Sequence, residues 1–80
     1  MILGEWLGRR GSVLAERELE ATLLAASDLT VKQIAKAMSI SPSTAEKSLD
    51  RAKYKLKARS LRGLVLAALT QGLIERTSDS

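Results

Sequence analysis

Two helix starts follow each other closely within residues 30–56, and this arrangement constrains the fold more than any other feature of the chain. Thr30 and Gln33 have the spacing of a capping box, in which each side chain accepts a hydrogen bond from the other residue's backbone N–H. Ser41 is a second N-cap candidate. Pro42 follows it at the first helical position, where the N–H that proline lacks would have no helical partner. The sequence therefore predicts a helix over 31–38, a short turn and another helix from residue 42.

Apolar residues in both segments recur at the spacing of one helical face. The first helix carries Ile34, Ala35 and Met38, and the second carries Ala45, Leu49, Ala52 and Leu56. Small residues on both helices favour a close crossing, and Ile40 can fill the corner between them. Two helices joined by so short a turn form a helix-turn-helix, whose second helix can enter the major groove of DNA.

Composition limits the other possibilities. The chain has 80 residues, enough for one domain with a small core. It contains no cysteine and no histidine, which excludes a disulfide framework and leaves almost no ligands for zinc. No apolar run approaches the ~20 residues that span a bilayer, and the start has no signal-peptide pattern. We expect a soluble cytoplasmic protein with no cofactor and no membrane association.

The basic charge is concentrated in the middle of the chain. Residues 1–31 have a net charge of −2, residues 32–62 of +7 and residues 63–80 of −1. The basic segment coincides with the predicted helix-turn-helix. A basic segment that coincides with such a motif favours contact with phosphates over a merely solvated face.

The coarse pattern predicts an all-α protein with four helices. Besides the central pair, a first helix is expected from Ser12 or Val13 to Ala26, and a fourth, capped by Ser60, from Leu61 to Leu73. The third helix should extend from Pro42 to Lys57. We divide the chain into an N-terminal extension (1–12), a DNA-binding domain (13–75) and a short polar tail (76–80).

The fourth helix is apolar on more than one face, so its surface needs a second burial partner. One candidate is a second copy of the chain. The predicted homodimer interface consists of Leu61, Val65, Leu66, Ala68, Leu69 and Leu73. The alternative is that the N-terminal residues Ile2, Leu3, Trp6 and Leu7 fold back over this helix, and both arrangements can coexist.

The chain resembles the LuxR-type helix-turn-helix domain of bacterial regulators over residues 14–65, without insertion or deletion. Five short matches in register carry this resemblance: Arg17-Glu18-Leu19-Glu20, Ile34-Ala35, Ile40-Ser41-Pro42-Ser43-Thr44, Tyr54-x-Leu56 and Arg59-Ser60. It implies a four-helix DNA-binding domain.

Several positions depart from the family pattern. Ala15 replaces the cap threonine of the first helix, which suggests an earlier start at Ser12. Asp28 replaces a glycine, which suggests a left-handed or turn position. Glu46 and Ser48 replace a frequent lysine and histidine, so the family's base contacts do not transfer directly. Residues 49–56 are also similar to the last DNA-binding region of sigma factors, but the apolar fourth helix favours the LuxR type.

The predicted DNA-binding residues lie mostly on the outer side of the third helix. Lys47 and Arg51 can donate to guanine, and Glu46 can accept from cytosine or else pair with Lys53 on the surface. Tyr54 is expected to pack at a helix junction. The full predicted set is Ser43, Thr44, Glu46, Lys47, Ser48 and Arg51, with Lys32, Lys36, Lys55 and Arg59 as contacts to the DNA backbone.

These patterns predict a sequence-specific transcription regulator that binds double-stranded DNA as a homodimer. An enzyme is disfavoured because Glu16, Glu18 and Glu20 are two residues apart and spread around a helix. The alternative class is a small interaction protein that pairs with a larger transcription regulator and blocks it, since Glu46 and Asp50 would repel DNA.

Overall fold

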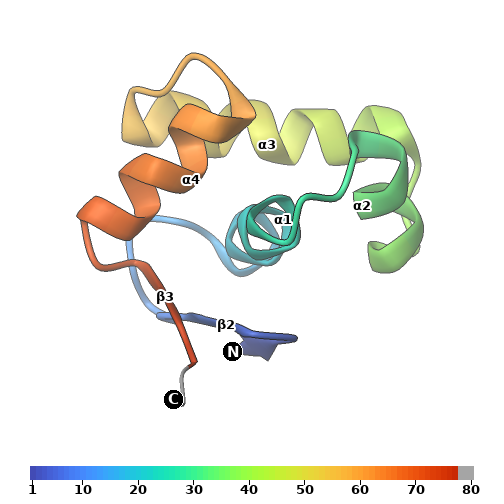
Figure 1. The fold of residues 1–80 in the computed structure, drawn as a ribbon. Helices are drawn as coiled ribbons and strands as arrows, with labels where there is room; N and C mark the ends of the chain where they lie inside the picture. Colours follow the sequence, from blue (N-terminus) through green and yellow to red (C-terminus); the bar gives the residue numbers. More distant parts are fainter. Residues whose placement is uncertain (78–80) are drawn as a thin grey trace.

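The computed structural model describes residues 1–77 and contains four helices and three short strands (Figure 1). The elements are β1 (Ile2–Leu3), β2 (Trp6–Gly8), α1 (Glu16–Ala26), α2 (Val31–Met38), α3 (Pro42–Leu56), α4 (Leu61–Thr70) and β3 (Ile74–Arg76). The four predicted helices are confirmed. The all-α class was incomplete, because it missed a three-stranded sheet built from both ends of the chain.

Helix α1 lies at the centre of the domain. It packs against the other three helices, and β1 and β2 pack against it as well. Figure 1 shows α1 nearly end-on, with α3 crossing on one side and the strands on the opposite side. The core residues of the helices include Leu19 and Leu23 from α1, Ile34 from α2, Leu49 from α3 and Leu64 from α4, all buried. The amphipathic stripes read from the sequence therefore converge on one core.

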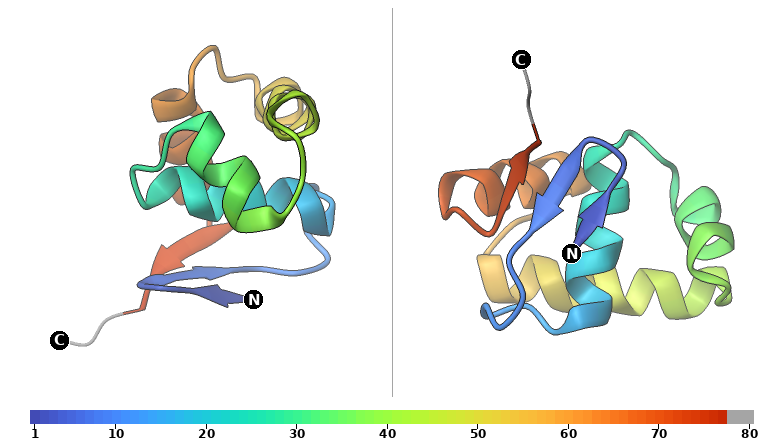
Figure 2. Two further views of the ribbon diagram at one scale, coloured as in Figure 1. Left: turned by 90° about the vertical axis from the view of Figure 1, so that its right-hand side faces the viewer. Right: turned by 90° about the horizontal axis from the view of Figure 1, so that it is seen from below.

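The sheet has the order β1-β2-β3, and both pairings are antiparallel. Trp6 lies opposite Arg76, and Gly8 lies opposite Ile74. A Cβ atom on Gly8 would be 2.9 Å from Leu23 Cδ1, so only glycine lets β2 approach α1 this closely. Figure 2 shows the strand from the C-terminal segment beside the N-terminal hairpin.

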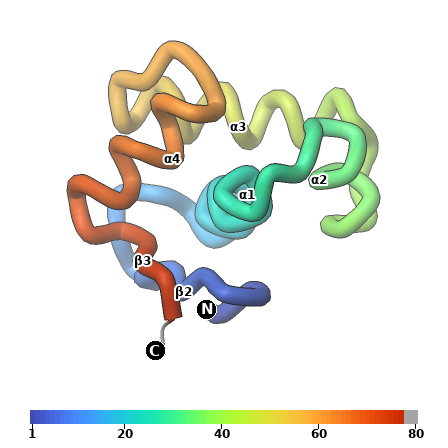
Figure 3. The backbone as a smooth tube through the Cα atoms, viewed as in Figure 1, coloured from blue at the N-terminus to red at the C-terminus, as the bar shows by residue number. Residues whose placement is uncertain are grey.

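The N-terminal segment folds back, but onto α1 and not over the outer face of α4. Residues 2–8 of the expected extension supply two strands, while Leu66 and Leu69 remain 56% and 37% exposed. Trp6 is half-buried against the core, and the Arg76 guanidinium lies 5.9 Å from the centre of its ring. Arg76 also pairs with Glu5 at 2.8 Å. The tube in Figure 3 shows both ends of the described chain on this side of the domain.

The expected polar tail lies only partly within the described residues. Arg76 belongs to β3, and Thr77 N–H donates to the Glu5 carbonyl at 2.8 Å. The remainder of that tail, residues 78–80, lies outside the described part of the chain.

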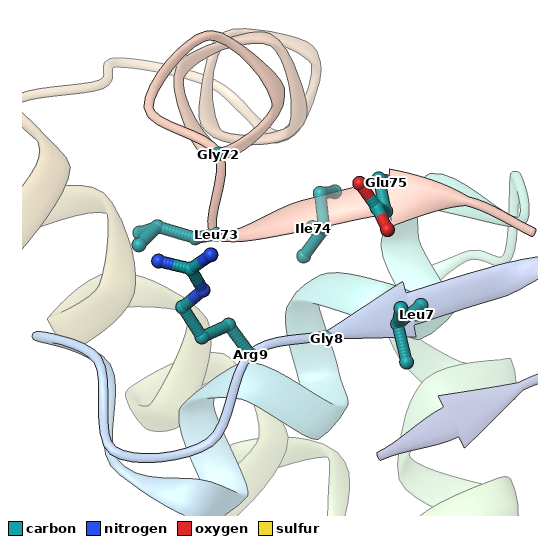
Figure 4. Close-up of a pocket in the computed structure, with 7 residues that line it drawn as sticks. All are labelled: Leu7, Gly8, Arg9, Gly72, Leu73, Ile74 and Glu75. Carbon is teal, nitrogen blue, oxygen red and sulfur yellow. The ribbon is translucent and has the colours of Figure 1, made fainter.

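A pocket of about 190 Å³ lies where the chain leaves α4 and enters β3. Figure 4 shows the Arg9 side chain beside Leu73 at this pocket. The Arg9 N–H donates to the Leu73 carbonyl at 2.8 Å, which continues the contact between β2 and β3 toward α4. Its lining residues belong to β2, to β3 and to the segments that adjoin these strands, so the pocket is separate from helices α2 and α3.

Two helix ends differ from the prediction. Helix α1 begins at Glu16, because the Glu18 carboxylate accepts from the Ala15 N–H at 2.9 Å and makes Ala15 the N-cap. Ser12 is not the cap; its hydroxyl accepts from the Leu14 N–H in the preceding turn. Helix α4 ends at Thr70, before Gly72, whose φ of 74° does not continue a right-handed helix.

Left-handed residues also follow α1 and α3. Asp28 has a φ of 67°, which confirms the turn position expected after α1. Helix α3 ends at Leu56, one residue before the predicted end, because Lys57 adopts a φ of 59° as its C-cap. The predicted bounds of α2 match the structure.

Candidate nucleic-acid interface

Local hydrogen bonds fix both ends of α2, including the turn that leads into α3. In the predicted capping box, Gln33 N–H donates to Thr30 Oγ1 at 3.2 Å and Thr30 N–H donates to Gln33 Oε1 at 2.9 Å. Ser39 ends α2 in the left-handed conformation, with Ile40 N–H donating to the Ala35 carbonyl at 3.0 Å.

The start of α3 follows from the next residues. Ser41 Oγ accepts from the Thr44 N–H at 3.1 Å, and Pro42 occupies the first turn. These bonds fix the direction in which α3 leaves the turn. Helix α3 also packs against α1, α2 and α4, so its orientation is set by the fold of the domain itself.

Helix α3 has one buried and one exposed side. Ala45, Leu49, Ala52 and Leu56 are buried against the rest of the domain, as predicted. Lys47 and Arg51 are exposed. With 100° between successive residues, they lie close together on the side opposite this buried stripe. The surface formed by the outward residues of α3 is called the α3 outer face below.

Most predicted DNA-binding residues are exposed, but Ser48 is not. The exposed members are Ser43, Thr44, Glu46, Lys47, Arg51 and Lys55 on α3, Lys32 and Lys36 on α2, and Arg59 after α3. The prediction for Ser48 was wrong: its residue is 8% exposed. It lies three residues after Ala45 and four before Ala52, so it belongs to the buried stripe.

Lys55 is an exposed residue, but its side chain forms an ion pair with Glu18 of α1. Its ammonium group donates to Glu18 Oε1 at 2.7 Å, and the Glu18 side chain is 8% exposed. Burial alone would raise the pKa of Glu18. Hydrogen bonds from Lys55 and from the Ala15 N–H, together with the charges of Lys55 and Arg51, outweigh it and hold the pKa below its ordinary value. Lys55 thus ties α3 to α1 and is less free to bind phosphate than the other basic residues.

The acidic residues of α3 form a separate stripe beside the basic one. Glu46 and Asp50 are four residues apart and line a shallow pocket of about 280 Å³, together with Val31 at the start of α2 and Leu61 at the start of α4. Asp50 pairs with Lys53 at 3.3 Å. Carboxylates near helix N-termini interact favourably with the positive ends of the helix dipoles. A stabilising interaction with the starts of α2 and α4 therefore explains two acidic residues in an otherwise basic segment.

Tyr54 is a surface residue that sequence reasoning misplaced. It was expected to pack at a helix junction, but it is 86% exposed. It lies seven residues after Lys47 and three after Arg51, so it belongs to the α3 outer face. This spacing was available from the sequence and should have outweighed the general tendency of aromatic residues to be buried.

The predicted dimer interface is also only partly at the surface. Leu66 and Leu69 are exposed, and Leu61, Val65 and Leu73 are half-buried. Ala68 was placed there wrongly, because it is fully buried four residues after the equally buried Leu64. These two residues define the inward side of α4. The outward side of α4 therefore combines exposed and half-buried apolar residues and does not include Ala68.

Comparison with known families identifies the arrangement. A family model described as "Bacterial regulatory proteins, luxR family" (GerE) matches residues 12–68, which include all four helices except the end of α4. The chain belongs to the LuxR family. A search of curated proteins found no match.

Membership of the LuxR family identifies the chain in general terms as a helix-turn-helix, DNA-binding regulator of transcription, a class of domain that is not enzymatic. The matched segment contains the α2–α3 unit and most of α4, whereas β1, β2 and β3 lie outside it. Within residues 1–77, no helix is long and apolar enough to cross a membrane. In the same residues, no group of three acidic or other metal-binding side chains could hold a metal ion.

Proposed function

We propose that this LuxR-family chain is a sequence-specific transcription regulator of the cytoplasm that inserts α3 into the major groove. The observation that carries the proposal is the exposed pair of Lys47 and Arg51 on the α3 outer face, one helical turn apart. Either side chain can reach guanine O6 and N7, the commonest specific contact in the major groove. Ser43 and Thr44 at the start of α3 are suited to phosphate, through their hydroxyls and the helix N-terminus.

Basic residues outside α3 extend the proposed contact. Lys32 and Lys36 are exposed on α2, and Arg59 is exposed at the turn before α4. Lysine and arginine beside a recognition helix neutralise phosphates and position the protein without reading sequence. Lys55 contributes less in this proposal because Glu18 already holds it.

We further propose that two copies bind together through the outward side of α4. Leu66 and Leu69 are exposed there, and Val65 is half-buried beside them. A symmetric dimer would bury this surface and present two α3 helices to half-sites about one DNA turn apart. Sedimentation should show a dimer for the natural chain and a monomer for Leu69→Glu. A natural chain that sediments as a monomer at micromolar concentration would contradict this part of the proposal.

The decisive experiment is a titration of duplex DNA, followed by fluorescence anisotropy, at several salt concentrations. DNA binding through basic residues predicts a steep loss of affinity as salt increases. Arg51→Ala should weaken binding by about tenfold, since one good base contact contributes about 1–3 kcal/mol. Arg17→Ala, which changes an exposed arginine on α1, is the matched control and should bind almost normally.

The same titration tests the alternative of an interaction protein that blocks a larger regulator. The acidic stripe of Glu46 and Asp50 favours that alternative, because like charges repel phosphate. An interaction protein would show no salt-dependent DNA affinity. Binding that is unchanged by Arg51→Ala in both strength and sequence preference would mean that α3 is oriented differently on the duplex.

A further inference from the structure

Glu46 is an exposed acid in the half of α3 that a helix-turn-helix domain presents to base edges. Its carboxylate has no ion pair and no side-chain hydrogen bond within residues 1–77. The surface pair expected with Lys53 is not formed, because the Lys53 ammonium group lies 3.3 Å from Asp50. Of the two acids on α3, Glu46 is therefore the one whose carboxylate remains free to accept hydrogen bonds.

The chemistry of the major groove restricts what an unpaired carboxylate can contact. An ionised carboxylate only accepts hydrogen bonds, and phosphates repel it. The groove offers two amino donors, N4 of cytosine and N6 of adenine. Adenine also presents N7, an acceptor next to its amino group, which would repel the carboxylate. Cytosine has no acceptor in the groove, so it is the base that best fits Glu46.

The neighbouring residue points to the same kind of base pair. Lys47 follows Glu46 directly, is also exposed, and projects about 100° further around α3. An ammonium group prefers guanine, whose O6 and N7 are both acceptors. Adjacent side chains of opposite charge thus match the donor and acceptor edges of G·C pairs.

We infer that Glu46 is a specificity-determining residue that accepts a hydrogen bond from a cytosine N4 amino group in each half-site. This inference rests on the proposed function, because it requires α3 to lie in the major groove. Beyond the proposed function, the inference names the base that the protein selects at one position of the DNA site. The carboxylate lowers affinity for DNA in general, through repulsion of phosphates, and recovers affinity only where cytosine is present.

The test is selection from a random duplex library, followed by sequencing of the bound DNA, for the natural chain and two variants. The natural chain should prefer cytosine at one position of each half-site by about tenfold over the other bases. Glu46→Gln should shift that preference to adenine, since glutamine pairs with adenine N6 and N7. It should also raise affinity for unrelated DNA, because one negative charge is lost.

Asp50→Asn is the matched control. It also removes one negative charge from α3, but one helical turn from Glu46 and at an acid that already pairs with Lys53. It should raise general affinity but leave the cytosine preference unchanged. If both variants enrich the same motif as the natural chain, Glu46 only repels phosphate and the inference is overturned. A loss of thermal stability in Glu46→Gln without a change of motif also overturns it, because Glu46 then acts only on the nearby helix ends.

Failure of the inference can be distinguished from failure of the proposed function. A natural chain that binds no duplex DNA at low salt refutes the proposed function and, with it, the role of Glu46. If the natural chain enriches a clear motif but Glu46→Gln changes no cytosine preference in it, only the inference about Glu46 is refuted. Thermal melts of all three proteins confirm that each is folded under the selection conditions.

Discussion

Helix α1 separates two surfaces that are built in different ways. Toward α3, the contact uses the buried stripe of Ala45, Leu49, Ala52 and Leu56 and the ion pair between Glu18 and Lys55. The opposite side of α3 is exposed and charged. Toward the sheet, Gly8 fits closely against α1, and Ile74 is buried. Packing and the proposed recognition of DNA thus use opposite sides of α3, whereas Gly8 and Ile74 of the sheet face the core.

This difference implies that substitutions should divide into two classes. Changes at the α3 outer face should alter DNA binding with little effect on folding, because these side chains make few internal contacts. Changes at the inner side of the sheet should alter folding without removing a DNA contact. Substitutions in the Glu18–Lys55 pair belong between the two classes, because this pair stabilises the contact of α1 with α3. The following substitutions test this division in order of decreasing effect.

Ile74→Ala should have the largest effect. Ile74 is 1% exposed, and shortening such a side chain leaves a cavity, so we expect a loss of about 2–5 kcal/mol in the free energy of unfolding. Urea denaturation followed by circular dichroism measures it. The control is Ile2→Ala, at a residue that is 64% exposed, which should change stability by less than about 0.5 kcal/mol. Equal stability of the two variants would mean that the sheet does not pack on the helices.

Gly8→Ala should be the next most harmful, with a loss of about 1–3 kcal/mol from overpacking. The added methyl group would lie 2.9 Å from Leu23 Cδ1, an atom of a fully buried side chain. Combining it with Leu23→Val, which removes that atom, should give a smaller loss than the sum of the two single changes. The measurement is the same denaturation experiment. Strict additivity would show that Leu23 is not the side chain that resists the added methyl group, which would then be Leu19, with Cδ1 and Cγ at 3.0 Å.

Glu18→Gln should cost about 1–2 kcal/mol, less than a fully buried pair, because Lys55 is partly exposed to solvent. The exposed Arg10–Glu16 pair provides the control, and Glu16→Gln should have almost no effect. DNA affinity measured under folding conditions should fall slightly or stay unchanged. A much larger fall in affinity than in stability would place Glu18 in the recognition surface.

The same pair predicts how stability depends on pH. The pKa of Glu18 is lowered from 4.5 in the folded state, so the folded protein binds this proton less tightly than the unfolded chain. Its stabilising contribution is present above the unfolded pKa and is lost as pH falls through the lower folded pKa. The gap in urea midpoint between the natural chain and Glu18→Gln should therefore be larger at pH 7 than at pH 3. A gap that widens toward pH 3 would contradict the assigned direction.

Tyr54→Ala should have the smallest effect, and only on binding. We expect a loss of about threefold in DNA affinity, as for one hydrogen bond of about 0.5–1 kcal/mol between the hydroxyl and a phosphate. Tyr54→Phe, which removes only the hydroxyl, should lose the same amount. Because Tyr54 is 86% exposed, neither change should alter the unfolding midpoint. A shift in that midpoint would return Tyr54 to a packing role.

Local interactions explain why α2, the turn and the start of α3 could be predicted from sequence. The capping bonds of Thr30 with Gln33 and of Ser41 with Thr44 join residues three positions apart, so their partners are visible in a short window. The end of α3 was predicted within one residue. The start of α1 was missed because Glu18 supplies the capping bond from within the helix.

Non-local pairing explains why the sheet could not be predicted. Trp6 lies opposite Arg76, almost the whole chain away, and strands of two or three residues are too short to show alternating hydrophobicity. Ala68 was misplaced for a different reason. Helix α4 is apolar on several sides, so its pattern does not distinguish the inward Leu64 and Ala68 from the outward Leu66 and Leu69.

The position of Trp6 has a practical consequence. It is the single tryptophan of the chain, and it lies on the sheet with the Arg76 guanidinium over its ring. Its emission will therefore report on the environment of β2 and β3, on the other side of α1 from the α3 outer face. Quenching by a soluble reagent will increase when the sheet detaches, whereas occupancy of α3 by a ligand will leave the signal nearly constant. The molecule carries an intrinsic optical probe for one of its two halves.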